Sequence, residues 1–139
     1  MITHKSSRLK ICSSPSEIVQ VESYVQTIAE RFNISPDIYP NILISLTEAV
    51  NNAIIHGNNK DKSKFVKVSL EENCDLLVFE ISDEGTGFDP NEIADPTSEE
   101  NIDCCGGRGV HIMKELSDEI DFLDNGRRVK ICFKHRCVG

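Results

Sequence analysis

The sequence lacks a hydrophobic run long enough to cross a membrane, which requires about 20 consecutive apolar residues. Residues 1–8 also lack the apolar segment of a secretory signal peptide. Tryptophan is absent, and aromatic residues make up only 6% of the chain. We therefore expect a cytoplasmic protein with no membrane association.

Positive charge is scarce as well. The chain has 15 lysine and arginine residues against 23 acidic residues, a formal net charge of -8, and no basic cluster of useful length. This balance argues against a nucleic-acid partner. It does not exclude nucleotide binding, because backbone amides and a metal ion can bind phosphate groups locally.

The six cysteines lack the spacing of a zinc site, since Cys104 and Cys105 are adjacent. Without a signal peptide, we expect reduced thiols rather than disulfides. Cys12, Cys74 and Cys132 fall within or beside expected strands, where a free cysteine behaves as a small hydrophobic residue. A metal or redox protein built on cysteines is therefore the weakest alternative.

The chain length of 139 residues fits a single domain, residues 1–139. Hydrophobic periodicity and turn residues predict an α+β fold, a two-layer sandwich of helices on a sheet. Between residues 83 and 109 the periodicity breaks down, which is typical of a functional loop or lid. The expected strands cover residues 8–13, 65–70, 76–81, 119–123 and 128–133, and the expected helices cover about 14–33, 35–57 and 109–117.

Candidate catalytic and metal-binding side chains lie in the segment Thr47–Gly57, whose sequence is TEAVNNAIIHG. Glu48, Asn52 and His56 are four residues apart, so they share one stripe of the expected helix. An amide oxygen of Asn52 suits Mg²⁺, and a carboxylate such as Glu48 can orient or deprotonate a hydroxyl. The alternative for these residues is an ordinary solvated helix face.

A glycine-rich segment, Asp83–Gly87, directly follows an expected strand. Gly85 and Gly87 allow the backbone to approach a flat ligand, and Asp83 can accept a hydrogen bond from an adenine amino group. The alternative is an ordinary glycine-rich turn.

A second glycine-rich segment, Gly106–Gly109, opens an expected helix. Free amides at a helix N-terminus bind phosphate oxygens, and Arg108 either adds charge or faces solvent. Neither glycine segment fits the dinucleotide-binding fingerprint or the Walker pattern.

These three segments, in this order, resemble the N, G1 and G2 boxes of the GHKL ATPase superfamily, which includes gyrase, histidine kinases and mismatch-repair ATPases. Within it, the chain is most similar to the anti-sigma-factor serine/threonine kinases of bacterial partner-switching systems. The resemblance implies a Bergerat fold, a two-layer sandwich with a mixed, mostly antiparallel sheet and helices on one face. A third glycine/threonine box near the C-terminus is not found.

The resemblance also implies a role for each matching residue. Glu48 would be the catalytic base, Asn52 the Mg²⁺ ligand and Asp83 the reader of adenine. Residues 89–105 would form the lid. The remaining residues implied to contact ATP are His56, Gly85, Gly87, Gly107, Arg108, Gly109 and Val110.

The function implied is an ATP-dependent protein serine kinase that binds a sigma factor, phosphorylates a serine of a STAS-type antagonist and forms a homodimer. The alternative is an ATP-gated protein-binding module without efficient phosphoryl transfer. Because mere binding needs no base, Glu48 together with Asn52 favours the kinase. A histidine-kinase fragment is disfavoured, since only one expected helix precedes the one that carries Glu48.

Overall fold

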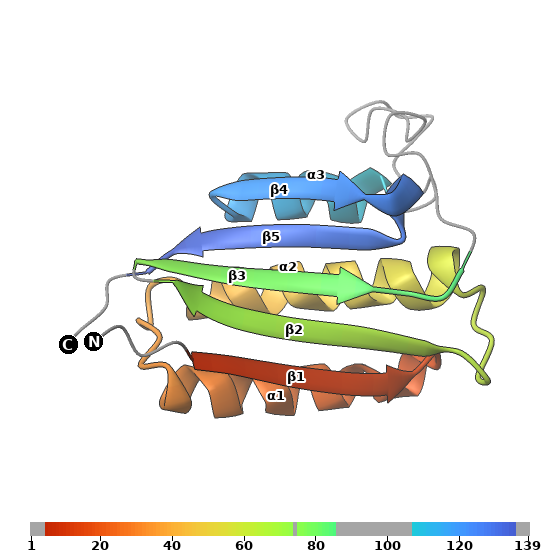
Figure 1. Ribbon diagram of the computed structural model, residues 1–139, viewed down its shortest axis with the longest axis horizontal. Helices are drawn as coiled ribbons and strands as arrows, with labels where there is room; N and C mark the ends of the chain where they lie inside the picture. Colours follow the sequence, from red (N-terminus) through yellow and green to blue (C-terminus); the bar gives the residue numbers. More distant parts are fainter. Residues whose placement is uncertain (1–4, 74, 86–106, 136–139) are drawn as a thin grey trace.

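The computed structural model describes residues 5–73, 75–85 and 107–135 of the chain. It confirms the α+β architecture: a five-stranded sheet carries three α-helices on one face (Figure 1). The strands are β1 Lys5–Cys12, β2 Phe65–Asn73, β3 Leu76–Ser82, β4 Glu119–Leu123 and β5 Arg128–Lys134. The helices are α1 Ile18–Arg31, α2 Tyr39–Asn52 and α3 Gly107–Leu116.

The strand order in the sheet is β1-β2-β3-β5-β4. Every strand pairing among the described residues is antiparallel, so this part of the sheet contains none of the parallel pairs that a mixed sheet would have. The β2–β3 and β4–β5 neighbours are the two expected hairpins. Along the chain, β3 is followed by α3 and then by the edge strand β4. The last strand, β5, lies between β3 and β4 in the sheet.

Alternation along the strands places one face of the sheet against the helices. In β3, Leu77, Phe79 and Ile81 are buried while their neighbours are partly exposed. Phe79 packs edge-to-face on a ring from β5, with ring centroids 5.9 Å apart. Helix α2 is central in the helical layer, in contact with both α1 and α3, and its inward positions are Ile42, Leu46, Ala49 and Val50. The layers thus enclose one hydrophobic core.

Several boundaries differ from the sequence prediction. Helix α2 begins at Tyr39 rather than near Ser35, because the Ser35 carbonyl accepts the N–H groups of both Ile38 and Tyr39 and forms a turn first. The second hairpin turns through a short 3-10 segment, Asp124–Gly126, and Asp124 adopts a φ of 51°. Strand β1 starts earlier than expected and ends one residue sooner.

The expectation that cysteines within or beside strands behave as small hydrophobic residues fits Cys132 but not Cys12. Cys132 is 4% exposed, whereas Cys12 is exposed at the end of β1. The reason is the alternation of the strand: Ile11 points into the core, so Cys12 points away from it. Cys74, Cys104 and Cys105 lie outside the described residues.

None of the helices in the described ranges combines the length and the apolar character that crossing a bilayer requires.

Candidate functional site

Helix α2 and the N-terminal turn of α3 meet at the residues that the sequence singled out. A Cβ atom added to Gly109 would lie 2.6 Å from Glu48 Oε2 and 3.5 Å from Asn52 Nδ2. Glu48 is half-buried and Asn52 is 9% exposed. The side chains of Glu48 and Asn52 therefore occupy the space that glycine leaves open at the start of α3.

The buried amide of Asn52 has an unused hydrogen-bonding group. Its Nδ2 atom has no hydrogen-bond partner in the described structure. A buried amide without a partner is costly, unless a bound molecule or ion completes its contacts. The Asn52 amide thus has a buried donor whose hydrogen-bonding capacity the described residues do not use.

The loop after β3 packs against the end of α2. The Gly85 N–H donates to Asp83 Oδ1 at 2.9 Å, and the Asp83 N–H donates to the Arg127 carbonyl at 2.9 Å. A Cβ on Gly57 would lie 2.3 Å from Asp83 Oδ2, and a Cβ on Gly85 would lie 1.7 Å from the Gly57 carbonyl oxygen. Two glycines thus let the two backbones touch and hold the Asp83 carboxylate beside them.

Asn52 and Asp83 line the same small cavity, although they come from different layers of the fold. An amide and a carboxylate therefore share an otherwise largely apolar cavity of about 10 Å³, which has room for a water molecule but not for a nucleotide. The other lining residues are Ala49, Ala53, Ile81, Met113, Phe122, Gly126 and Val129.

Burial raises the pKa of the Asp83 carboxyl above its ordinary value. The hydrogen bond from Gly85 and the positive charges of Arg127 and Lys64 act in the opposite direction but do not cancel the effect of burial. The carboxylate thus retains a strong tendency to accept a hydrogen bond from a bound group.

Replacing Asp83 by asparagine is expected to change how stability depends on pH. Between the ordinary pKa of 3.8 and the raised value in the folded state, the folded protein holds a proton that the unfolded chain has lost. The contribution of Asp83 to the free energy of unfolding therefore falls as pH rises through this window. Urea titrations are expected to show the Asp83→Asn variant gaining stability relative to wild type as pH rises above the ordinary carboxyl pKa of 3.8. A difference that does not change with pH would contradict this.

His56 does not continue the stripe of Glu48 and Asn52. After Asn52 the helix widens into a π-helical turn, Ala53–Gly57, whose hydrogen bonds close over five residues rather than four. This spacing takes His56 out of step with the two residues before it. Burial lowers the pKa of the His56 ring, and no described hydrogen bond or ion pair involves its side chain.

Asn58 is a structural residue of the site that the sequence patterns do not single out. Asn58 is fully buried, and its Oδ1 accepts the Glu84 N–H at 2.8 Å. Its Nδ2 donates to the Phe65 carbonyl at 3.0 Å and to the Ser13 hydroxyl. This amide ties the loop after β3 to the ends of β1 and β2, and local sequence carries no signal for such contacts.

Replacing Asn58 by alanine is expected to lower the free energy of unfolding by about 1–3 kcal/mol, because buried partners lose their hydrogen bonds. The half-exposed Asn41 on α2 offers a matched control, and Asn41→Ala is expected to be near neutral. Chemical denaturation of both variants checks this. Equal effects of the two substitutions would show that the Asn58 network contributes nothing particular.

The predicted phosphate-binding segment is described only in part. Gly107 begins α3, so the glycine segment does open a helix, and Val110 is 4% exposed against the core. Gly87 and residues 89–105 lie outside the described residues, and the side chain of Arg108 is not described either.

Comparisons with known proteins show the family to which this fold belongs. Residues 11–133 match the family described as histidine kinase-like ATPase domain. The chain is 26% identical over 124 residues to serine-protein kinase RsbW of Bacillus subtilis (strain 168), covering 81% of this chain and 74% of that protein. It is 31% identical over 119 residues to anti-sigma F factor of Bacillus cytotoxicus, covering 79% of this chain and 80% of that protein.

A solved structure shares the fold. The crystal structure of the RsbU and RsbW domains of a Mycobacterium tuberculosis protein aligns with 95% of this chain at a TM-score of 0.61 and 13% identity. The chain spans 32% of the length of that larger protein. At this identity the likeness shows the fold alone.

Proposed function

Because the chain belongs to the histidine kinase-like ATPase domain family, we propose that it is an ATP-dependent protein serine kinase that also acts as an anti-sigma factor. The names of its relatives, serine-protein kinase RsbW and anti-sigma F factor, support this. The observation that carries the proposal is the contact of Glu48 and Asn52 with the start of α3 at Gly109.

The base of ATP would be recognised by Asp83. Its carboxylate accepts a hydrogen bond from the exocyclic amino group of adenine, while Gly57 and Gly85 allow the two backbones to approach and leave room for that carboxylate. The first amides of α3, from Gly107 to Val110, bind phosphate oxygens at the positive end of the helix dipole. Gly87, Arg108 and His56 are further proposed contacts.

Magnesium would be held by Asn52. The residues fit such an ion after a half-turn of the Asn52 amide, since the buried atom without a partner is Nδ2 and this rotation puts Oδ1 in its place. A bound Mg²⁺ would neutralise charge on the phosphates of ATP. Few protein ligands are needed, because Mg²⁺ keeps several waters and binds substrate phosphates.

Glu48 would act on the incoming serine. Its carboxylate accepts the proton of the serine hydroxyl as that oxygen attacks the terminal phosphoryl group, which leaves from the adjoining phosphate of ATP. The half-buried position of Glu48 beside Gly109, at the start of α3, supports this role. The Glu48 position favours the kinase over a module in which ATP only gates protein binding.

The partners follow from the same proposal. The serine would belong to a STAS-type antagonist, the regulated partner would be a sigma factor, and the kinase would work as a homodimer.

Incubation with γ-labelled ATP, Mg²⁺ and the STAS proteins of the same genome tests the proposal. Label is expected on one serine of one STAS protein, and adding EDTA is expected to prevent the transfer. ATP binding without transfer to any of these proteins would instead support the gating module. An absence of ATP binding in calorimetry would reject both.

A further inference from the structure

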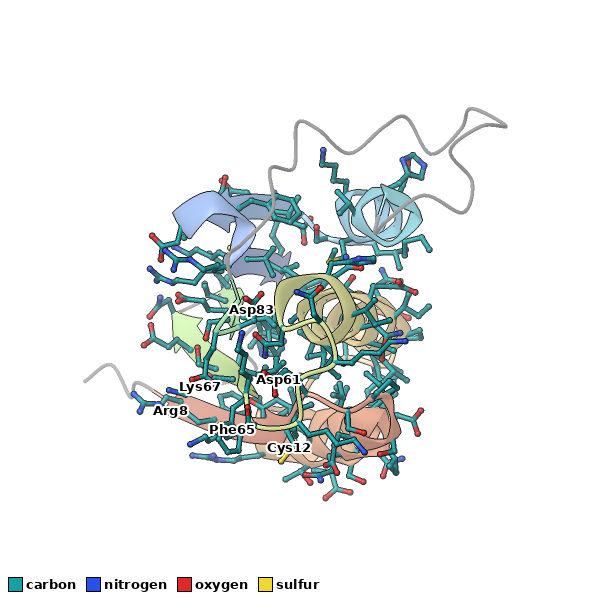
Figure 2. All side chains as sticks on the ribbon, turned by 90° about the vertical axis from the view of Figure 1, so that its right-hand side faces the viewer. Arg8, Cys12, Asp61, Phe65, Lys67 and Asp83 are labelled. Atoms are coloured by element: carbon teal, nitrogen blue, oxygen red, sulfur yellow. The ribbon has the colours of Figure 1, made fainter. Side chains whose placement is uncertain are left out.

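The face of the sheet opposite the helices carries a groove of about 520 Å³. Three exposed cations in its lining form what we term the basic cluster: Arg8 and Lys10 on β1 and Lys67 on β2. Figure 2 shows Arg8 and Lys67 on the side of the sheet away from the helices. The rest of the lining consists of Leu9, Val68, Ser69, Glu80 and Ser82.

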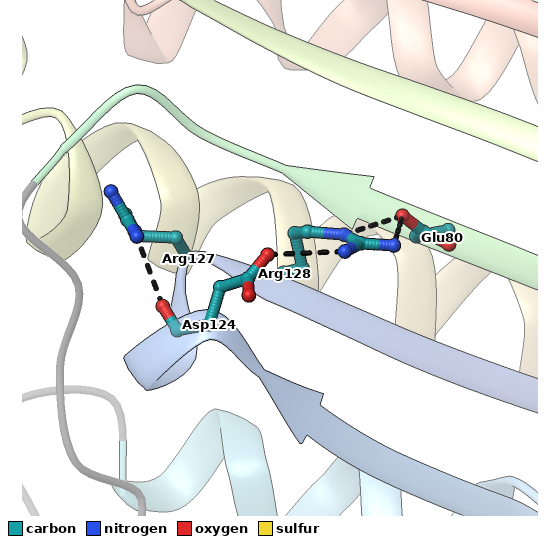
Figure 3. Close-up of polar contacts among 4 residues, drawn as sticks. All are labelled: Glu80, Asp124, Arg127 and Arg128. Atoms are coloured by element: carbon teal, nitrogen blue, oxygen red, sulfur yellow. Dashed lines mark hydrogen bonds and ion pairs between the residues drawn. The ribbon is translucent and has the colours of Figure 1, made fainter.

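The basic cluster has no anionic partner among the described residues, because none of the four ion pairs found there includes it. The one carboxylate that lines the groove, Glu80, is already engaged by Arg128, with Nη2 and Nε 2.6 and 2.7 Å from its Oε1 (Figure 3). Arg128 also binds Asp124 at 3.1 Å. The groove therefore presents three cations whose charge the fold does not neutralise.

Two of these cations face each other directly. In the antiparallel register of β1 and β2, Lys10 is opposite Lys67, and Arg8 is opposite Ser69. Like charges opposite each other destabilise a sheet. The Lys10 ammonium lies 4.2 Å from the centroid of the Phe65 ring, a cation–π contact beside the groove. An anion bound between the two lysines would remove the repulsion and gain charge-assisted hydrogen bonds.

We propose that this groove binds an extended acidic segment of a protein partner, with its carboxylates against the basic cluster. A chain with a net charge of -8 repels a long polyanion such as nucleic acid, but a short acidic segment meets mainly the local field of three cations. The hydroxyls of Ser69 and Ser82 provide hydrogen bonds to the backbone of such a segment.

The groove adjoins the candidate site through β3, because Ser82 in the groove directly precedes Asp83. The groove and the candidate site nevertheless open on opposite faces of the sheet, because successive residues of a strand point to opposite sides. The inference rests on the proposed function only in expecting a protein partner, since binding in the groove does not require phosphoryl transfer.

Fluorescence anisotropy with a fluorescein-labelled peptide of alternating glutamate and serine, about ten residues long, tests the proposal. The double variant Lys10→Gln/Lys67→Gln is expected to weaken binding at least about tenfold. The control Lys62→Gln/Lys114→Gln removes two exposed charges outside the groove and is expected to bind like wild type. The melting temperature of the first variant is expected to stay level or rise, because the opposed charges are gone.

Equal weakening by both double variants would overturn the proposal, since net charge alone would then explain binding. It would also be overturned if the same peptide with glutamine in place of glutamate bound as well. Tighter binding of a thymidine oligonucleotide or of phosphatidylserine vesicles, lost in the Lys10/Lys67 variant, would assign the groove to another class of partner and reject the acidic segment. Calorimetry with ATP on the same samples tests the proposed function independently.

Discussion

Replacing Glu48 by glutamine is expected to lower the rate of phosphoryl transfer by about 10²–10⁴-fold, the range that a general base contributes. Glutamine has nearly the shape of glutamate, so it keeps the packing against Gly109 while removing the group that accepts the proton. Binding of Mg·ATP is expected to change little, because the phosphates and the adenine ring of ATP are held by other groups. Single-turnover transfer of label and calorimetry on the same sample separate the two effects.

The exposed Glu22 on α1 provides a control for the loss of one negative charge, and Glu22→Gln is expected to retain full transfer. If Glu48→Gln also kept full activity, Glu48 would not be the base. If it lost ATP binding to the same extent as activity, its role would be in holding the nucleotide.

Replacing Gly85 by alanine is expected to destabilise the fold by about 3 kcal/mol, equivalent to about 10 °C in melting temperature. The new Cβ would lie 1.7 Å from the Gly57 carbonyl oxygen, and neither backbone can move without separating the loop after β3 from α2. Loss of that contact also displaces Asp83, so nucleotide binding is expected to be lost together with stability. Thermal denaturation followed by circular dichroism measures the first effect.

Replacing Gly109 by alanine is expected to affect activity rather than stability, in contrast to Gly85→Ala. Here the added Cβ meets the end of a flexible side chain, Glu48, at 2.6 Å, and alanine is a better helix former than glycine. The melting temperature is therefore expected to hold while phosphoryl transfer falls. A Gly109→Ala variant as unstable as Gly85→Ala would show that both glycines serve only packing.

Hydrophobic periodicity was sufficient to predict the helices and strands, because it reports which face of each segment is buried. It was less able to predict where helix α2 begins and on which side of its element a given residue lies. The turn at Ser35 delays the start of α2, and the π-helical turn after Asn52 shifts His56, since both depend on hydrogen bonds rather than on apolar spacing. The exposure of Cys12 follows from the alternation of β1, in which Ile11 faces the core, so the residue type alone was a poor guide to this thiol.

The basic cluster shows the same limit on the surface. Arg8 and Lys10 are separated by an apolar residue and Lys67 is distant in the chain, so the sequence shows no basic run, and only the pairing of β1 with β2 sets Lys10 opposite Lys67. Asn58 is comparable: its three partners come from separate segments, so its role depends on the folded chain.

The sequence by itself determined that Glu48 and Asn52 share one helix and that glycines follow one strand and open another helix, because these relations involve neighbouring residues. Only the tertiary structure decided that Gly109 lies against Glu48 and that Gly57 lies against Asp83. Those residues are distant in the chain, and strand order and helix packing bring them together. Local periodicity carries no information about such approaches, because it describes one segment at a time.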